Sequence, residues 1–101
     1  MNYVVIGDED AVLGFGMVGV QGHVARNPNE AEAAFRTALE NRDIGIVIIT
    51  ERVAELIRPL VDDYMFTEEF PLIVEIPDRG GRIEGRPGLR EMVNRAIGIT
   101  L

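Results

Sequence analysis

The residues best suited to bind a phosphate group lie near the start of the chain. Residues 14–19 match the pattern G-x-G-x-x-G, whose glycines let a backbone approach a pyrophosphate at the start of a helix. That role requires the glycines directly after the first strand, but the strand-like run here ends near Ile6, and Asp8, Glu9 and Asp10 intervene. Three carboxylates at a helix start would repel a pyrophosphate. We therefore interpret the glycines as small residues that let a short helix pack closely on a sheet, and we predict no nucleotide cofactor.

The same three carboxylates suggest a metal site. Acidic residues after the first strand hold magnesium in phospho-receiver domains, which also need an acceptor aspartate at the end of the third strand and a lysine. Thr50 occupies the acceptor position, and the chain has no lysine. We interpret Asp8 as a helix N-cap, with Glu9 and Asp10 favoured by the helix dipole, and we predict no metal.

The remaining reactive side chains form no catalytic set. The chain has no cysteine and no serine, which excludes disulfides, thiolate metal ligands and serine nucleophiles. His23 is the single histidine, and the sequence offers no partner that would make it a general base. We predict no catalytic residue and interpret His23 as structural.

The composition indicates one acidic, soluble domain. The 101 residues suit a single domain, and 47% of them are apolar, which is enough for a core. The formal charge is −7, and such a surface repels nucleic acid and anionic lipid. No apolar run approaches the ~20 residues of a membrane span. No basic leader precedes the first strand, so we expect a cytoplasmic location.

Apolar runs of strand length alternate with helical patterns. Strands are expected at residues 3–6, 19–24, 44–49 and 71–76, and most are continuous apolar runs, as in parallel sheets buried on both faces. The first long helix is expected to begin at the capping signal Asn27-Pro28. Its apolar stripe comprises Ala31, Ala34, Phe35, Ala38 and Leu39.

Two more helical patterns follow. Thr50 is expected to cap a helix whose stripe continues to Tyr64, with only a kink at Pro59. The last stripe comprises Leu89, Met92, Val93, Ala96 and Ile97.

The order βαβαβαβα predicts an α/β fold of the Rossmann or flavodoxin-like type. Its four-stranded parallel sheet, with flanking helices, is expected in the order 2-1-3-4. We divide the chain into an α/β core domain (1–77), a glycine-rich loop or hinge (78–88) and a short C-terminal helix with its tail (89–101). The alternative for residues 78–88 is a long connecting loop that does not act as a hinge.

With catalysis and cofactor binding excluded, the remaining candidates for function are apolar residues that we expect to be exposed. Met65 and Phe66 lie near the end of the third helical pattern, and Ile99 and Leu101 follow the last one. Such residues indicate docking against another surface, unless they fold back on their own core.

These segments together resemble the F subunits of the archaeal and vacuolar-type rotary ATPases. The resemblance is carried by YVVIGDED (3–10), IGIVIITE (44–51), PLIVEIP (71–77) and RAIGI (95–99), which occur in the order and spacing of that family. It covers the whole chain.

The resemblance implies a non-catalytic subunit of the central stalk, with no cofactor, in a membrane-associated complex. Such a subunit binds the D subunit, which is the coiled coil of the rotor. It contacts the catalytic A/B hexamer transiently, and it helps couple ATP turnover to ion transport without entering the membrane. Its C-terminal segment is mobile and regulatory. Docking of a helix against the coiled coil would use the apolar residues Met65, Phe66, Leu89, Met92, Val93, Ile97, Ile99 and Leu101. The C-terminal members of this set would otherwise cover the sheet.

Two other functions stay open at this point. A degenerate receiver domain that binds partners without being phosphorylated would share the βα order and the acidic cluster. The other is a small nucleotide-dependent enzyme, and the glycine pattern at residues 14–19 is the only feature that supports it.

Overall fold

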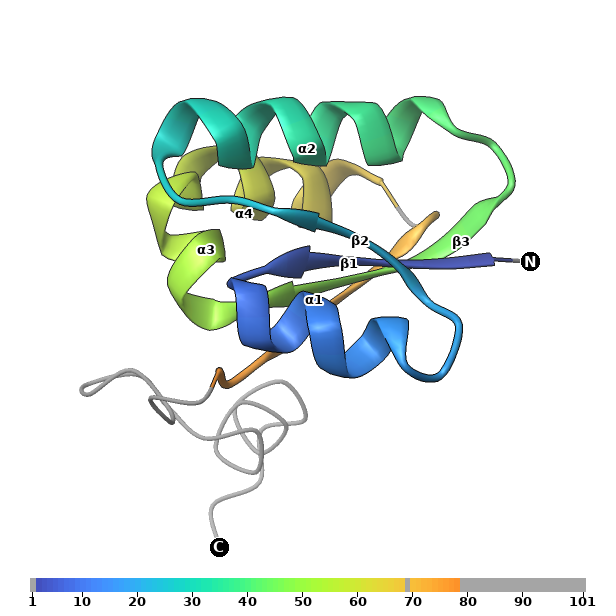
Figure 1. The fold of residues 1–101 in the computed structure, drawn as a ribbon. Coiled ribbons are helices and arrows are strands. Elements are labelled where there is room, and N and C mark those ends of the chain that lie inside the picture. Colours follow the sequence, from blue (N-terminus) through green and yellow to red (C-terminus); the bar gives the residue numbers. More distant parts are fainter. Residues whose placement is uncertain (1, 69, 79–101) are drawn as a thin grey trace, which may run out of the picture.

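The computed structural model describes residues 2–68 and 70–78 (Figure 1). The elements are, in chain order, β1 (Asn2–Gly7), α1 (Glu9–Gly16), β2 (Gln21–Val24), α2 (Pro28–Glu40), β3 (Ile44–Thr50), α3 (Glu51–Leu56), α4 (Arg58–Thr67) and β4 (Leu72–Ile76). The helix and tail predicted for residues 89–101, and all but the first residue of the predicted hinge, lie outside the described residues.

The strands form one parallel sheet in the order β2-β1-β3-β4, as predicted. α2 and α4 cover one face of the sheet, and α1 lies on the other (Figure 1). α3 adds Val53 and Ala54 to the core beneath α2. The α/β class and the strand order are therefore confirmed.

The core lies between the sheet and the layer of α2, α3 and α4. Val4, Ile6, Val47 and Ile49 from the two central strands are buried there together with Phe35 of α2. The rings of Phe35 and of Tyr64 on α4 pack in a T-shaped arrangement, with ring centroids 5.7 Å apart. The predicted stripe of α2 is confirmed, since only its last member, Leu39, is partly exposed.

Three predicted N-caps are present. Asp8 Oδ1 accepts the backbone N–H of Ala11 at 3.1 Å, and the Asn27 side chain accepts that of Glu30 at 2.9 Å. The hydroxyl of Thr50, which is fully buried, accepts the backbone N–H of Val53 at 3.4 Å. Each cap satisfies a donor that the first turn of a helix leaves free.

The prediction of one kinked helix from Thr50 to Tyr64 was wrong. The chain forms two helices, α3 and α4, separated at Ile57, whose backbone (φ −131°, ψ 36°) is not helical. Pro59 explains the break, because it donates no hydrogen bond to the carbonyl of Glu55 and its ring crowds that carbonyl. Pro59 instead occupies the first turn of α4, where a missing N–H costs nothing.

The interpretation of the glycine pattern was also wrong. A Cβ on Gly14 or Gly16 would have no neighbour within 4 Å, so close packing of α1 on the sheet does not require them. That close contact involves Gly22 of β2, where a Cβ would lie 2.8 Å from side chains of Val5 and Val12. Gly19 has a positive φ of 89° in the turn after α1, a conformation that favours glycine.

Candidate protein-interaction surface

The carboxyl ends of the strands carry the acidic cluster that suggested a metal site. Asp8 caps α1, and Glu9 forms an ion pair with Arg26, whose guanidinium pKa is raised chiefly by its hydrogen bond to Glu9. Among the described residues no group of three or more histidine, aspartate or glutamate side chains is arranged to hold a metal ion. Asp8, Glu9 and Thr50 therefore stabilise local structure.

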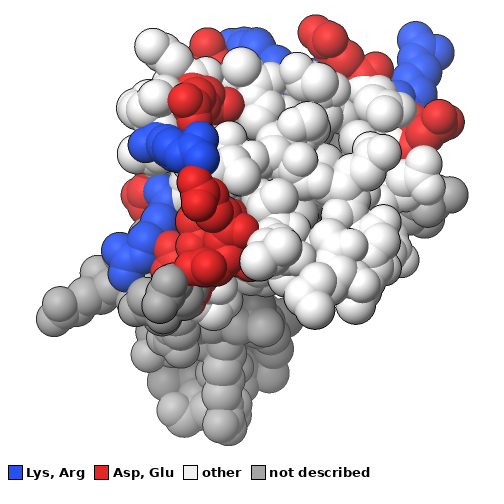
Figure 2. Space-filling model, viewed as in Figure 1, with Lys and Arg blue, Asp and Glu red and all other residues white. Residues whose placement is uncertain are grey.

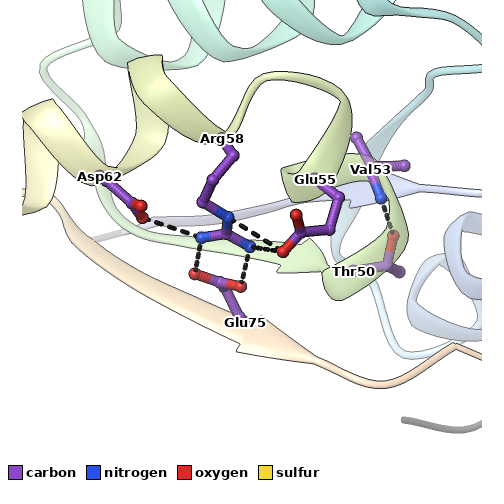
Figure 3. A network of polar contacts seen from close by, with 6 residues as sticks. All are labelled: Thr50, Val53, Glu55, Arg58, Asp62 and Glu75. Atoms are coloured by element: carbon purple, nitrogen blue, oxygen red, sulfur yellow. Dashed lines mark hydrogen bonds and ion pairs between the residues drawn. The ribbon is translucent and has the colours of Figure 1, made fainter. Parts of the chain in front are cut away.

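Arg58 joins three elements at the break between α3 and α4 (Figure 3). Its guanidinium binds Glu75 of β4 through two parallel hydrogen bonds of 2.7 Å, and Glu55 and Asp62 lie at 3.0 Å. The side chains of Arg58 and Glu75 are only 18% and 14% exposed. The pKa of Arg58 is raised, chiefly by the hydrogen bond to Glu75, so the cation is permanent and fastens the edge strand to the helical layer.

A second arginine fixes the point where the described chain ends. Arg52 of α3 binds Asp78 at 3.1 Å, and the side chain of Asp78 is 7% exposed. The last described residue therefore lies beside α3, at the carboxyl end of β4.

On the face that carries α1, the described residues cover only half of the sheet. Val5 and Gly22 of β1 and β2 lie under α1, as their contacts with Val12 indicate. Strand register places these residues on the same face as Ile48 of β3 and Val74 of β4. The apolar residues Tyr3, Ile46, Ile48, Leu72 and Val74 on this face are partly or well exposed. We call them the open sheet face.

α1 carries a second apolar area on its outer side, which we call the α1 patch. It comprises Leu13 and Met17, which are 67% and 81% exposed, and Val18 in the turn that follows. Figure 2 shows an uncharged expanse over this region, whereas charged side chains gather at the left and along the upper edge of the view. Beside Val18 is an open hollow of about 480 Å³, which Tyr3 and Ile44 also line.

Two of the predicted contact residues lie in the described part of the chain, both on α4. Phe66 is 91% exposed on the last turn of α4, next to the half-exposed Met65. Leu89, Met92, Val93, Ile97, Ile99 and Leu101 lie outside the described residues. The α1 patch was missed, although one signal was visible: no charged or polar side chain occurs from Ala11 to Val20. None of the helices in residues 2–68 and 70–78 has the length and apolar character to cross a membrane.

Comparison with known proteins finds relatives that match this chain over its whole length. Residues 4–95 match the family model described as ATP synthase (F/14-kDa) subunit. The chain is 42% identical to the F subunit of the A-type ATP synthase of Pyrococcus furiosus, over 100% of this chain and 98% of that protein. It is 34% identical to the same subunit of Methanothermobacter thermautotrophicus, over 99% and 95% of the two chains. With the corresponding protein of Methanocaldococcus jannaschii it shares 32% identity over 100% and 99%.

Proposed function

This chain belongs to the family described as ATP synthase (F/14-kDa) subunit, and from that premise we propose that it is a non-catalytic part of the central stalk that binds the coiled-coil D subunit. The single observation that carries the proposal is the full-length similarity to the F subunits of A-type ATP synthases. Binding of the D subunit would join the domain to the rotor and so help couple ATP turnover to ion transport. Its location would be the cytoplasmic side of a membrane complex.

The structure supports a role in binding rather than catalysis. The side chains that first suggested chemistry cap helices or form an ion pair, as Asp8, Thr50 and Glu9 do. Several large apolar side chains are also exposed, and Phe66 is the most exposed of them among the described residues. Exposed apolar patches are typical of surfaces that dock other proteins. Met65 and Phe66 are therefore proposed contacts for the D subunit. From the sequence pattern alone we also propose Leu89, Met92, Val93, Ile97, Ile99 and Leu101.

We further propose that the C-terminal segment is regulatory. Residues 79–101 contain five arginines and two glutamates, whereas the chain as a whole has a charge of −7. A basic segment with an apolar stripe suits an acidic core whose described residues leave half of one sheet face uncovered. In this proposal residues 89–101 exchange between the open sheet face and the partners in the stalk, including a transient contact with the A/B hexamer.

The function is tested by mixing the purified chain with the purified D subunit of the same complex, each at micromolar concentration. A one-to-one complex on a sizing column is expected, with its mass measured by light scattering. Separate elution of the two proteins at these concentrations would contradict the proposal. Removal of the chain from the assembled ATP synthase should weaken the coupling of ATP hydrolysis to ion transport.

A further inference from the structure

We propose that the α1 patch is a contact for the D subunit, and that one helix of the D coiled coil packs across Leu13, Met17 and Val18. The inference rests on the proposed function, since it names the face by which the chain would join the stalk. It adds a contact to those proposed for Met65 and Phe66, which lie on the opposite side of the sheet.

The first argument is that α1 is apolar on both sides. Its inner side packs on the sheet through Ala11 and Val12, whose side chains approach Gly7 and Gly22. On the outer side of a surface helix one expects polar residues, but Leu13 and Met17 occupy it and no residue of α1 is fully buried. A helix that is apolar all round is normally covered on all sides. The described residues therefore leave the outer side of α1 uncovered.

The second argument comes from the two glycines within α1. Gly14 and Gly16 have no positive φ, and neither has a neighbour within 4 Å of the place where a Cβ would stand. Glycine weakens a helix, and nothing in the described part of the domain compensates for that loss here. The distance between two packed helices depends on the size of the side chains at the crossing point. Glycines beside Leu13 and Met17 would let a partner helix approach α1 closely.

The third argument is charge, which decides between possible occupants. A second copy of the chain would bring another charge of −7 against a surface that begins with Glu9 and Asp10. The chain's own C-terminal segment begins after Asp78, beyond β4, where the open sheet face is the adjoining apolar surface. The chemistry that fits the α1 patch is a helix with an apolar stripe whose own charge does not add to the charge of −7 on this chain. The hollow beside Val18 is large enough to take one of its apolar side chains.

The test measures the affinity of full-length variants for the purified D subunit. Leu13→Gln combined with Met17→Gln removes the apolar patch with residues that favour helix. The dissociation constant should rise at least tenfold, while Leu56→Gln, a matched change of an exposed leucine on α3, should change it less than twofold. Gly14→Ala should also weaken the complex several-fold, although it should leave the thermal stability of the free chain equal or higher. Circular dichroism of each free variant checks that the fold is kept.

A cross-link identifies the occupant. Because the chain has no cysteine, Met17→Cys provides a unique thiol for a photoactivatable cross-linker. Cross-links to a helix of the D subunit would support the proposal. Cross-links to residues 79–101 or to a second copy, or an unchanged affinity of the Leu13→Gln/Met17→Gln variant, would overturn it. If the wild-type chain does not bind the D subunit at all, the proposed function fails instead, which is a different outcome.

Discussion

Replacing Arg58 by methionine should destabilise the domain strongly without touching its apolar core. The guanidinium holds Glu75 by two hydrogen bonds of 2.7 Å, and both side chains are largely buried. Methionine fills a similar volume but leaves the carboxylate of Glu75 without its cation. Breaking a buried ion pair by removing one partner typically costs about 3–5 kcal/mol.

The expected loss in unfolding free energy is somewhat below that range, at about 2–3 kcal/mol, because Arg58 keeps 18% of its side chain exposed. For a domain of this size each kcal/mol corresponds to roughly 4–8 °C, so the melting temperature should fall by about 10–20 °C. Urea unfolding at pH 7, followed by far-ultraviolet circular dichroism, measures the free energy directly.

Two controls separate the ion pair from its surroundings. Arg58→Met combined with Glu75→Leu removes both charges and should recover at least half of the loss, because apolar pairs often replace buried ion pairs without cost. Arg36→Met removes a partner from the exposed pair with Glu32, at 3.6 Å, and should change stability by less than about 0.5 kcal/mol. An effect of Arg58→Met as small as that of Arg36→Met would refute the reasoning.

Packing, titration and proteolysis offer three further tests. Gly22→Ala places a Cβ 2.8 Å from Val5 and Val12 and should cost about 1–3 kcal/mol in urea unfolding. Gly14→Ala, which meets open space, should instead stabilise the free chain by about 0.5–1 kcal/mol, and equal effects of the two changes would contradict the packing of α1. Burial, and secondarily Glu68, raises the pKa of Tyr64 above 10, its ordinary value, so the neutral phenol is favoured in the folded state. The resulting stability is present below that value and is lost as pH rises through the folded pKa. Between about pH 9 and 11 the free energy of unfolding should fall more steeply with pH for the wild type than for Tyr64→Phe. Identical slopes for the two proteins would contradict this prediction. The hinge predicted at residues 78–88 contains Arg79 and Arg82, neither of which is followed by proline, and trypsin should cleave the native protein there quickly. Slow cleavage would count against a hinge.

The fold was predictable because its signals are local. Alternating apolar runs and helical patterns indicated the parallel sheet, and single side chains such as Asp8, Asn27 and Thr50 marked helix starts. At Pro59 the prediction failed because a proline on the exposed side of a helix is compatible with a kink or a break. The backbone of Ile57 decides between them, and the apolar stripe does not reveal it.

The surface proposed for partner binding was less predictable because exposure depends on how elements pack. The glycine pattern at residues 14–19 drew attention to α1, but only the structure shows that Gly22, outside the pattern, receives the close contact. Leu13 and Met17 were overlooked because an apolar residue in a helix is normally assigned to the core. The network of Arg58 was also missed, since Glu75 is 17 residues away along the chain.

The placement of β4 at the edge of the sheet has a mechanical consequence. Any pull on the C-terminal segment enters the domain at Asp78, directly beyond this strand. Five residue pairs align β4 with β3. A force along β4 loads the hydrogen bonds between these strands together, so they do not break one after another. The two arginine attachments, from Arg52 and Arg58, brace the same strand from the helical side. In the proposed stalk, a load applied beyond Asp78 would act on the sheet in shear, which is the direction in which the domain should resist unfolding most.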